Sequence, residues 1–299
     1  MSMTIASRSS RRRKSLHTAA VLLVLLGPAV VMVAGVLGYA VVSGAVTSLF
    51  RVEVWTVGTP FVGLENYQRL FRSPTFINSL TRSLIFVAGT IGLGSVISMV
   101  FALVLHSVRW GRGLFRAIAL VPYLVSGVAA AVMWRFLFTG DTSLINMGLV
   151  AIGSESIPWL ARPNLALLVV TLANIWFISP FSTLILLGGL QGIDPQLYEA
   201  AMIDGARSHQ SFWHITMPSI APMMALSFMW LSFASFNMFD IILPLTGGGP
   251  GRATEVLAVH MYQLAFRDLN YSTASAVMVV LLVINVVFSL VYLRLFRER

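Results

Sequence analysis

The sequence has 299 residues, of which 57% are hydrophobic and only 10% are charged, compared with about 25% charged residues in ordinary soluble domains. This composition excludes a soluble fold, and the absence of cysteine excludes disulfide frameworks, thiolate metal sites and cysteine nucleophiles. The net charge of +9 does not indicate nucleic-acid binding, because the arginines cluster at the ends of apolar stretches instead of forming one basic face.

Six apolar stretches are long enough to cross a bilayer core, which is about 30 Å thick and needs roughly 20 helical residues. They comprise residues 18–42, 83–107, 115–138, 165–190, 218–245 and 272–293. We therefore predict an all-α, polytopic membrane protein with six transmembrane helices. It consists of a basic tail, residues 1–17, and a single membrane domain, residues 18–299.

The first stretch follows a basic run, residues 11–14, that also resembles the start of a signal peptide. The apolar run that comes next, residues 19–42, is too long for the core of such a peptide, which favours an uncleaved helix. With this end in the cytoplasm, more than half of the basic residues fall on the cytoplasmic side, including Arg109, Arg112 and Arg116. Both termini are therefore predicted to be cytoplasmic.

Small residues recur along the second stretch, where Gly94, Ser98 and Ala102 are spaced four residues apart. Such residues let helices approach closely in lipid, so this face is predicted to pack against another helix. The alternative is that small residues are simply frequent in membrane helices.

The connection between the fourth and fifth stretches, residues 191–216, is dense in helix signals. Asp194 followed by Pro195 is typical of an N-cap with proline at the first helical position. Gly205 ends that helix, and a second one is predicted over residues 206–217. The connection is therefore predicted to contain two short helices with a glycine elbow on the cytoplasmic face.

Several residues of this connection resemble the EAA loop of binding-protein-dependent ABC importer permeases. They are Glu199-Ala200-Ala201, Asp204-Gly205-Ala206, Phe212, Ile215 and Pro218. The resemblance implies a type I ABC importer permease fold, with a cytoplasmic coupling helix between helices 4 and 5. One departure is Met217, where the family has leucine, and this change conserves apolar volume. Patterning alone favours a peripheral amphipathic helix with a solvated Glu199.

In this family the loop is implied to transmit nucleotide-driven closure of a separate ATPase to the membrane helices. Glu199 would offer a carboxylate to a basic residue of the ATPase, and Gly205 would adopt turn dihedrals that other residues resist. ATP and magnesium are then bound by the partner, and no cofactor by this chain. A phosphate-binding loop also needs a lysine after its glycines, and the only lysine here is Lys14.

Three further segments resemble the carbohydrate-uptake permeases, specifically the maltose-permease-like first chain of a heterodimeric pair. They are Gly63-Leu64-Glu65-Asn66-Tyr67, Met133-Trp134-Arg135-Phe136 running into Asp141 and Leu144-Ile145-Asn146, and Phe239-Asp240 through the glycine run 247–251 to Ala253-Thr254-Glu255. The resemblance implies a bacterial inner-membrane importer for a sugar-like solute. It also implies a second homologous permease, two ATPase subunits and an extracytoplasmic solute-binding protein as partners.

Polar and aromatic residues within the predicted spans are candidates for the solute path, because polar groups are costly in lipid and usually face a bundle interior. The candidates are Asn174, Trp176, Trp230, Asn237 and Asp240. An alternative for Asp240 is a structural ion pair with Arg135, which would reduce the burial cost of both charges.

No catalytic or metal-binding pattern accompanies these residues. His209 and His214 are five residues apart and lack a nearby third ligand, and the sequence has no HExxH motif or nucleophile elbow. We therefore predict that the chain is not an enzyme. The alternative function is a secondary transporter driven by an ion gradient, but the internal repeats and mid-membrane ionisable groups typical of that class are not apparent.

Overall fold

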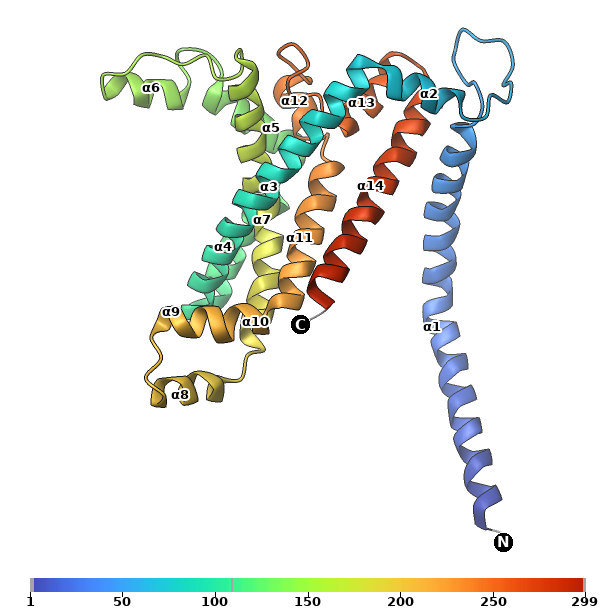
Figure 1. Cartoon of the computed structure of the whole chain (residues 1–299), viewed down its shortest axis with the longest axis vertical. Helices are drawn as coiled ribbons and strands as arrows, with labels where there is room; N and C mark the ends of the chain where they lie inside the picture. Colours follow the sequence, from blue (N-terminus) through green and yellow to red (C-terminus); the bar gives the residue numbers. More distant parts are fainter. Residues whose placement is uncertain (1–2, 109, 298–299) are drawn as a thin grey trace.

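The structure, a computed structural model of the chain, describes residues 3–108 and 110–297 and is almost entirely helical (Figure 1). Its α-helices and two π-helices (η) are α1 (Met3–Thr47), α2 (Glu65–Arg72), α3 (Pro74–Ser107), α4 (Arg112–Leu124), α5 (Gly127–Phe138), α6 (Leu144–Ala151), α7 (Pro163–Gln191), α8 (Pro195–Ile203), α9 (Ser208–Ser211), η1 (Phe212–Thr216), α10 (Met217–Ser219), α11 (Ala221–Phe236), α12 (Ile242–Thr246), α13 (Leu257–Tyr262), η2 (Gln263–Arg267) and α14 (Tyr271–Arg297). The described residues contain no sheet, only two isolated bridges. The all-α prediction is confirmed.

Six membrane crossings are present among the described residues when each bent helix pair is counted as one. Four are single helices, namely Val24–Thr47, Pro74–Ser107, Pro163–Gln191 and Tyr271–Phe296. The other two are bent pairs, Gly113–Leu124 with Gly127–Phe138 at 89° and Ser208–Ser219 with Ala221–Phe236 at 70°. The predicted number of spans agrees with this count, but two of the six are not single straight helices.

The third predicted span, residues 115–138, was wrong as one continuous helix. Pro122 lies in the last turn of α4, where it has no backbone N–H to donate. Val125 and Ser126 then adopt extended dihedrals, and α5 begins at Gly127. Both halves are apolar, so hydropathy alone does not reveal the break.

Three other boundaries also differ from the prediction. The first helix continues to Thr47, and the predicted tail is helical within α1, apart from residues 1 and 2, which lie outside the described residues. The helix α3 begins at Pro74 because Ser73 caps it, its Oγ accepting a hydrogen bond from the Phe76 amide at 3.5 Å. The fifth span ends at Phe236, and α12 follows as a separate short helix.

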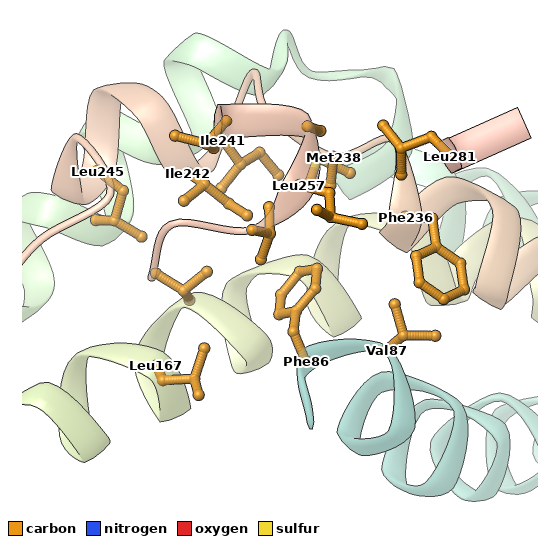
Figure 2. Close-up of a cluster of buried hydrophobic side chains, with 14 of the residues drawn as sticks. Phe86, Val87, Leu167, Phe236, Met238, Ile241, Ile242, Leu245, Leu257 and Leu281 are labelled. Carbon is orange, nitrogen blue, oxygen red and sulfur yellow. The ribbon is translucent and has the colours of Figure 1, made fainter. Parts of the chain in front are cut away.

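The main core lies where α3, α7 and the segment after α11 meet. Figure 2 shows Phe86 and Val87 from α3 and Leu167 from α7 pointing toward Phe236, Ile242 and the residues that follow. These side chains are buried, and they fix α12 and α13 over the ends of α3 and α7. The core therefore concentrates at one end of the helix bundle.

The small-residue face of α3 packs as predicted. A Cβ added to Gly94 would lie 3.6 Å from Ser179 Oγ of α7. Ser98 donates its hydroxyl to the Ser179 carbonyl at 3.3 Å, and Ala102 is fully buried in a second cluster with Leu186. These contacts confirm that α3 and α7 approach closely along this face.

Helix α1 stands apart from most of the bundle in Figure 1, and the residues of its apolar window are exposed, as expected for a helix surrounded by lipid. It packs against α14, where the end of the Met278 side chain lies directly against Gly44. Both termini lie at the same end of the molecule as α8, α9 and α10 (Figure 1). Arg109, which the topology prediction counts as cytoplasmic, lies outside the described residues.

Candidate functional site

The first candidate site is the connection between α7 and α11, which begins with the short helix α8. Asp194 is its N-cap and accepts a hydrogen bond from the Gln196 amide at 2.9 Å, while Pro195 occupies the first helical position. This satisfies an amide that would otherwise be unpaired and fixes where the helix begins. The predicted start of the first short helix is confirmed.

The elbow after α8 depends on Gly205. Its φ is +77°, a backbone conformation that side chains with a Cβ rarely adopt. The Ala206 amide donates to the Ala201 carbonyl at 2.8 Å, and the Gly205 amide donates to Met202 at 3.1 Å, so the carbonyls at the helix end are paired. A Cβ on Gly205 would meet no atom within 4 Å. The backbone angle, and not crowding, is therefore what requires glycine here.

The second short helix begins at Ser208, two residues later than predicted, and continues through η1 and α10 up to the 70° bend. The Arg207 amide donates to Gln210 Oε1 at 2.7 Å at its start. Tyr198 of α8 is hydrogen bonded through its hydroxyl to Thr216 Oγ1 at 2.8 Å. This contact connects α8 to the segment that leads directly into the fifth span.

No residue of α8 is buried, although the helix is rich in apolar side chains. Met202 is 66% exposed and Ile203 is 87% exposed. Glu199 is also exposed, and it forms no ion pair with any residue in the described ranges. An exposed apolar helix outside the predicted spans, carrying an unpaired carboxylate, is typical of a surface that a protein partner covers.

A notch of about 280 Å³ lies between α8 and the second short helix. It is lined by Ala201, Asp204, Gly205, Ala206, Gln210, Ser211, His214 and Ile215. The notch thus brings together five residues of the predicted coupling motif, whereas Glu199, Ala200, Phe212 and Pro218 do not line it.

Of the predicted path residues, Asn174 is fully buried at the meeting point of three helices. Its Nδ2 donates to Thr90 Oγ1 of α3 at 3.1 Å and to Ser235 Oγ of α11 at 3.0 Å. Its Oδ1 has no partner in the part of the chain that the structure describes. In this conformation Asn174 therefore joins helices and is enclosed by protein.

The two predicted tryptophans lie in different aromatic groups. Trp176 faces Trp134 of α5, with ring centroids 6.2 Å apart. The ring centroid of Trp230 in α11 lies 4.4 Å from that of Phe181 and 6.0 Å from that of Tyr123. The sequence analysis missed Tyr123 and Phe181, because their helices are far apart in the chain and nothing local indicates that they meet.

The remaining two predicted path residues lie outside α11. Asn237 is exposed, and its Nδ2 donates to the Phe233 carbonyl at 2.8 Å. Asp240 lies in the turn before α12, and its carboxyl group contacts Gly127 so closely that a Cβ there would overlap it. A negative charge is favoured at that place, because Gly127 is the first residue of α5 and helix N-termini carry a partial positive charge.

The alternative pairing of Asp240 with Arg135 is not observed, because no ion pair joins these two residues in the described structure. Nor do the described residues contain a group of three or more His, Asp or Glu side chains that would suit a metal ion.

The sequence also matches a family that is described as a binding-protein-dependent transport system inner membrane component, over residues 94–298. That match covers more than half of the chain and includes the whole α8 elbow. The chain belongs to this family. It is therefore a multi-pass membrane permease of an ABC transporter and not a secondary transporter.

Individual relatives of this permease agree with that assignment. The trehalose/maltose transport system permease protein MalF of Thermococcus litoralis is 36% identical over 255 residues, which cover 84% of this chain and 85% of the relative. The sulfoquinovosyl glycerol transport system permease protein SmoG of Agrobacterium fabrum is 33% identical over 283 residues, covering 92% and 90%.

A solved structure is also similar to the whole permease. It is a bacterial ABC transporter involved in the import of the acidic polysaccharide alginate, with a TM-score of 0.79 and 22% identity over 96% of this chain and 99% of that chain. This similarity shows that the permease has the fold of an ABC importer permease, as the sequence analysis predicted.

Proposed function

We propose that this permease forms half of the translocation path of an ABC importer for a carbohydrate or carbohydrate-like solute. The observation that carries the proposal is the elbow of α8, which has no buried residue, is positioned by Gly205 and is connected through Tyr198 to the start of the fifth span. The named relatives support the solute class, since they are permeases for trehalose/maltose and for sulfoquinovosyl glycerol.

The proposed partners are a second homologous permease, two ATPase subunits and an extracytoplasmic solute-binding protein. ATP and magnesium bind to the ATPase subunits, and this chain binds no cofactor of its own. The chain lies in the bacterial inner membrane with both termini in the cytoplasm, on the same side of the membrane as α8. The excess of basic residues on that side supports this orientation.

Coupling follows from how the elbow is built. When the ATPase subunits close on ATP, they displace α8, whose exposed apolar side chains and Glu199 provide the contact surface. The Tyr198–Thr216 hydrogen bond passes this displacement to η1, and from there across the bend to α11. Movement of α11 opens the path outward, and ATP hydrolysis resets it.

The proposed path includes Asn174, Trp176, Trp230, Asn237 and Asp240, together with Tyr123 and Phe181. Aromatic faces next to amide and carboxylate groups suit a sugar, because the rings stack on its C–H groups while the polar groups bind its hydroxyls. Trp230, Tyr123 and Phe181 already lie together. Asn174 becomes accessible only when α3 and α11 separate, since it is bonded to both.

The proposal is tested by purifying the tagged chain from its native membranes in mild detergent and identifying what accompanies it. We expect a homologous permease and an ATPase at one ATPase chain per permease chain, and ATP-dependent sugar uptake after reconstitution with the binding protein. A chain that purifies alone and moves solute without ATP would overturn the proposal.

A further inference from the structure

The most continuously buried segment of the described structure is neither in the coupling elbow nor among the path candidates. Residues 253–260, which we call the buried segment, are all buried, and they follow the glycine loop, residues 247–251. Both lie at the end of the molecule opposite α8 (Figure 1), where α13 contacts α3. The buried segment contains a carboxylate and an imidazole, Glu255 and His260, which are 2% and 6% exposed.

All polar contacts of the Glu255 carboxylate in the described structure involve one oxygen, Oε1. Its Oε1 lies 2.9 Å from His260 Nδ1, 3.4 Å from the hydroxyl of Ser79 on α3, and 3.7 Å from Arg252. A buried charge is tolerated only when it is paired and hydrogen bonded. Glu255 therefore connects three parts of the chain, namely α3, α13 and Arg252, the residue directly after the glycine loop.

Helix α3 provides two further contacts to the same region. Ser83, one turn after Ser79, accepts a hydrogen bond from the Leu257 amide at 2.7 Å. Asn78 donates to the carbonyl of Arg252 at 3.0 Å. Arg252 has a φ of +62°, which is unusual for a residue with a side chain. The surrounding contacts thus hold the end of the glycine loop in a shape that it would not adopt unaided.

The glycine loop packs directly on Glu255. A Cβ added to Gly248 would lie 3.4 Å from the Glu255 Cβ and 3.5 Å from Val259. Thr254 is bonded to the glycine loop, since its hydroxyl donates a hydrogen bond to the Gly249 carbonyl at 2.8 Å. The loop itself remains partly exposed, with Gly247 and Gly251 at the surface. The Glu255 side chain thus contacts the loop through its Cβ, while its carboxylate accepts from Ser79 of α3 and pairs with Arg252, the residue directly after the loop.

We infer that Glu255 is a positioning residue for transport. Its carboxylate fixes the glycine loop on α3 and so presets the outer surface that receives the solute-loaded binding protein. This inference rests on the proposed function, because it requires that the binding protein docks on the side opposite α8. A loop that is fixed beforehand loses less conformational entropy on docking, so removal of the carboxylate weakens docking without altering the coupling elbow.

The test uses the complete complex of both permeases and the ATPase in lipid nanodiscs, titrated with solute-loaded binding protein. In Glu255→Ala we expect normal assembly and basal ATPase activity, but a half-saturating binding-protein concentration raised about tenfold. Glu255→Gln is expected to lie in between, since its amide oxygen still accepts a hydrogen bond from Ser79 but does not attract Arg252. Asp268→Ala is the matched control, because Asp268 is an exposed carboxylate beyond the same segment.

A second readout reports on the loop itself. Trypsin cleavage after Arg252 should be faster in Glu255→Ala than in the wild type, whereas cleavage after Arg72, at the exposed end of α2, should not change. Wild-type half-saturation and wild-type cleavage in both variants would overturn the inference. Loss of assembly and of basal ATPase activity in both Glu255 variants would also overturn it, because Glu255 would then be needed only for folding. If the wild-type complex itself were not stimulated by any binding protein, the proposed function would fail instead.

Discussion

The two ends of this permease use hydrogen bonds in opposite ways. At the α8 end, a short helix without buried residues is shaped by local contacts, the Asp194 cap and the Gly205 turn. At the other end, the segment around Glu255 is enclosed, and its partners on α3 are distant in sequence. We propose that the first surface is covered by another protein, whereas the second is stabilised by the chain itself. Mutations at the two ends should therefore affect different measurements.

The largest effect is expected from Gly205→Val. A β-branched residue at a φ of +77° costs on the order of 3 kcal/mol, so we expect ATP-dependent uptake to fall about a hundredfold through loss of ATPase docking. Because no residue of α8 is buried, we expect local rearrangement of the elbow to relieve this strain, so the unfolding temperature of the purified chain should change little. Gly113→Val is the control, because Gly113 is helical and a Cβ there meets no atom within 4 Å. Wild-type uptake in Gly205→Val would remove α8 from the coupling role.

At the opposite end, Ser83→Ala should lower the stability of the permease. It leaves the buried Leu257 amide without an acceptor, which costs about 2 kcal/mol and is measurable as a lower unfolding temperature in detergent. ATPase docking should be unaffected. Ser95→Ala on the same helix is the comparison, since the Ser95 hydroxyl bonds only to its own helix, at the Gly92 carbonyl. Equal unfolding temperatures in the two variants would contradict this assignment.

Glu199→Lys reverses an exposed charge that has no intramolecular partner among the described residues. We expect ATPase affinity to weaken about tenfold, because the carboxylate would face a basic residue of the ATPase. The unfolding temperature should stay the same. Gln191→Lys introduces a lysine at the end of α7 without removing a carboxylate, and should have little effect. Weakening that is equal in both variants would indicate a general effect of charge.

The smallest effect is expected from Asp194→Ala. Loss of an N-cap costs about 1 kcal/mol, so ATPase affinity should decrease roughly fivefold through fraying of α8. Asp194→Asn retains a capping oxygen and should remain close to the wild type. If the asparagine variant were as weak as the alanine variant, the charge of Asp194, and not its hydrogen bond, would be what matters.

The same contrast explains what the sequence could predict. The elbow was predictable because its signals are local: Asp194 and Pro195 mark a helix start, and Gly205 marks a turn. The Glu255 contacts were not predictable, because Ser79 and Glu255 are separated by 176 positions. The break between α4 and α5 was missed for another reason. Hydropathy averages over both halves, whereas the bend depends on Pro122 and on the dihedrals of two residues.

The candidate path was predicted only in part. Asn174 was correctly placed within the fourth span, but its two donated hydrogen bonds show that a buried amide also serves helix packing. Asp240 was assigned to a membrane helix and lies instead in the turn after it, where it contacts the start of α5. Polarity within an apolar stretch therefore predicted residues that lie in or next to the spans, but not the groups that surround them.

The packing of α1 against α14 has a consequence for how the chain is made. Helix α1 is synthesised before α14 and meets this partner only after α14 has been made. Until then, α1 is kept in the bilayer by its own hydropathy, because none of the residues in its apolar window is buried by protein. Closure of the helix bundle is thus a late event in biogenesis. A nascent chain interrupted before α14 would be inserted in the membrane and still lack the contact that joins its beginning to its end.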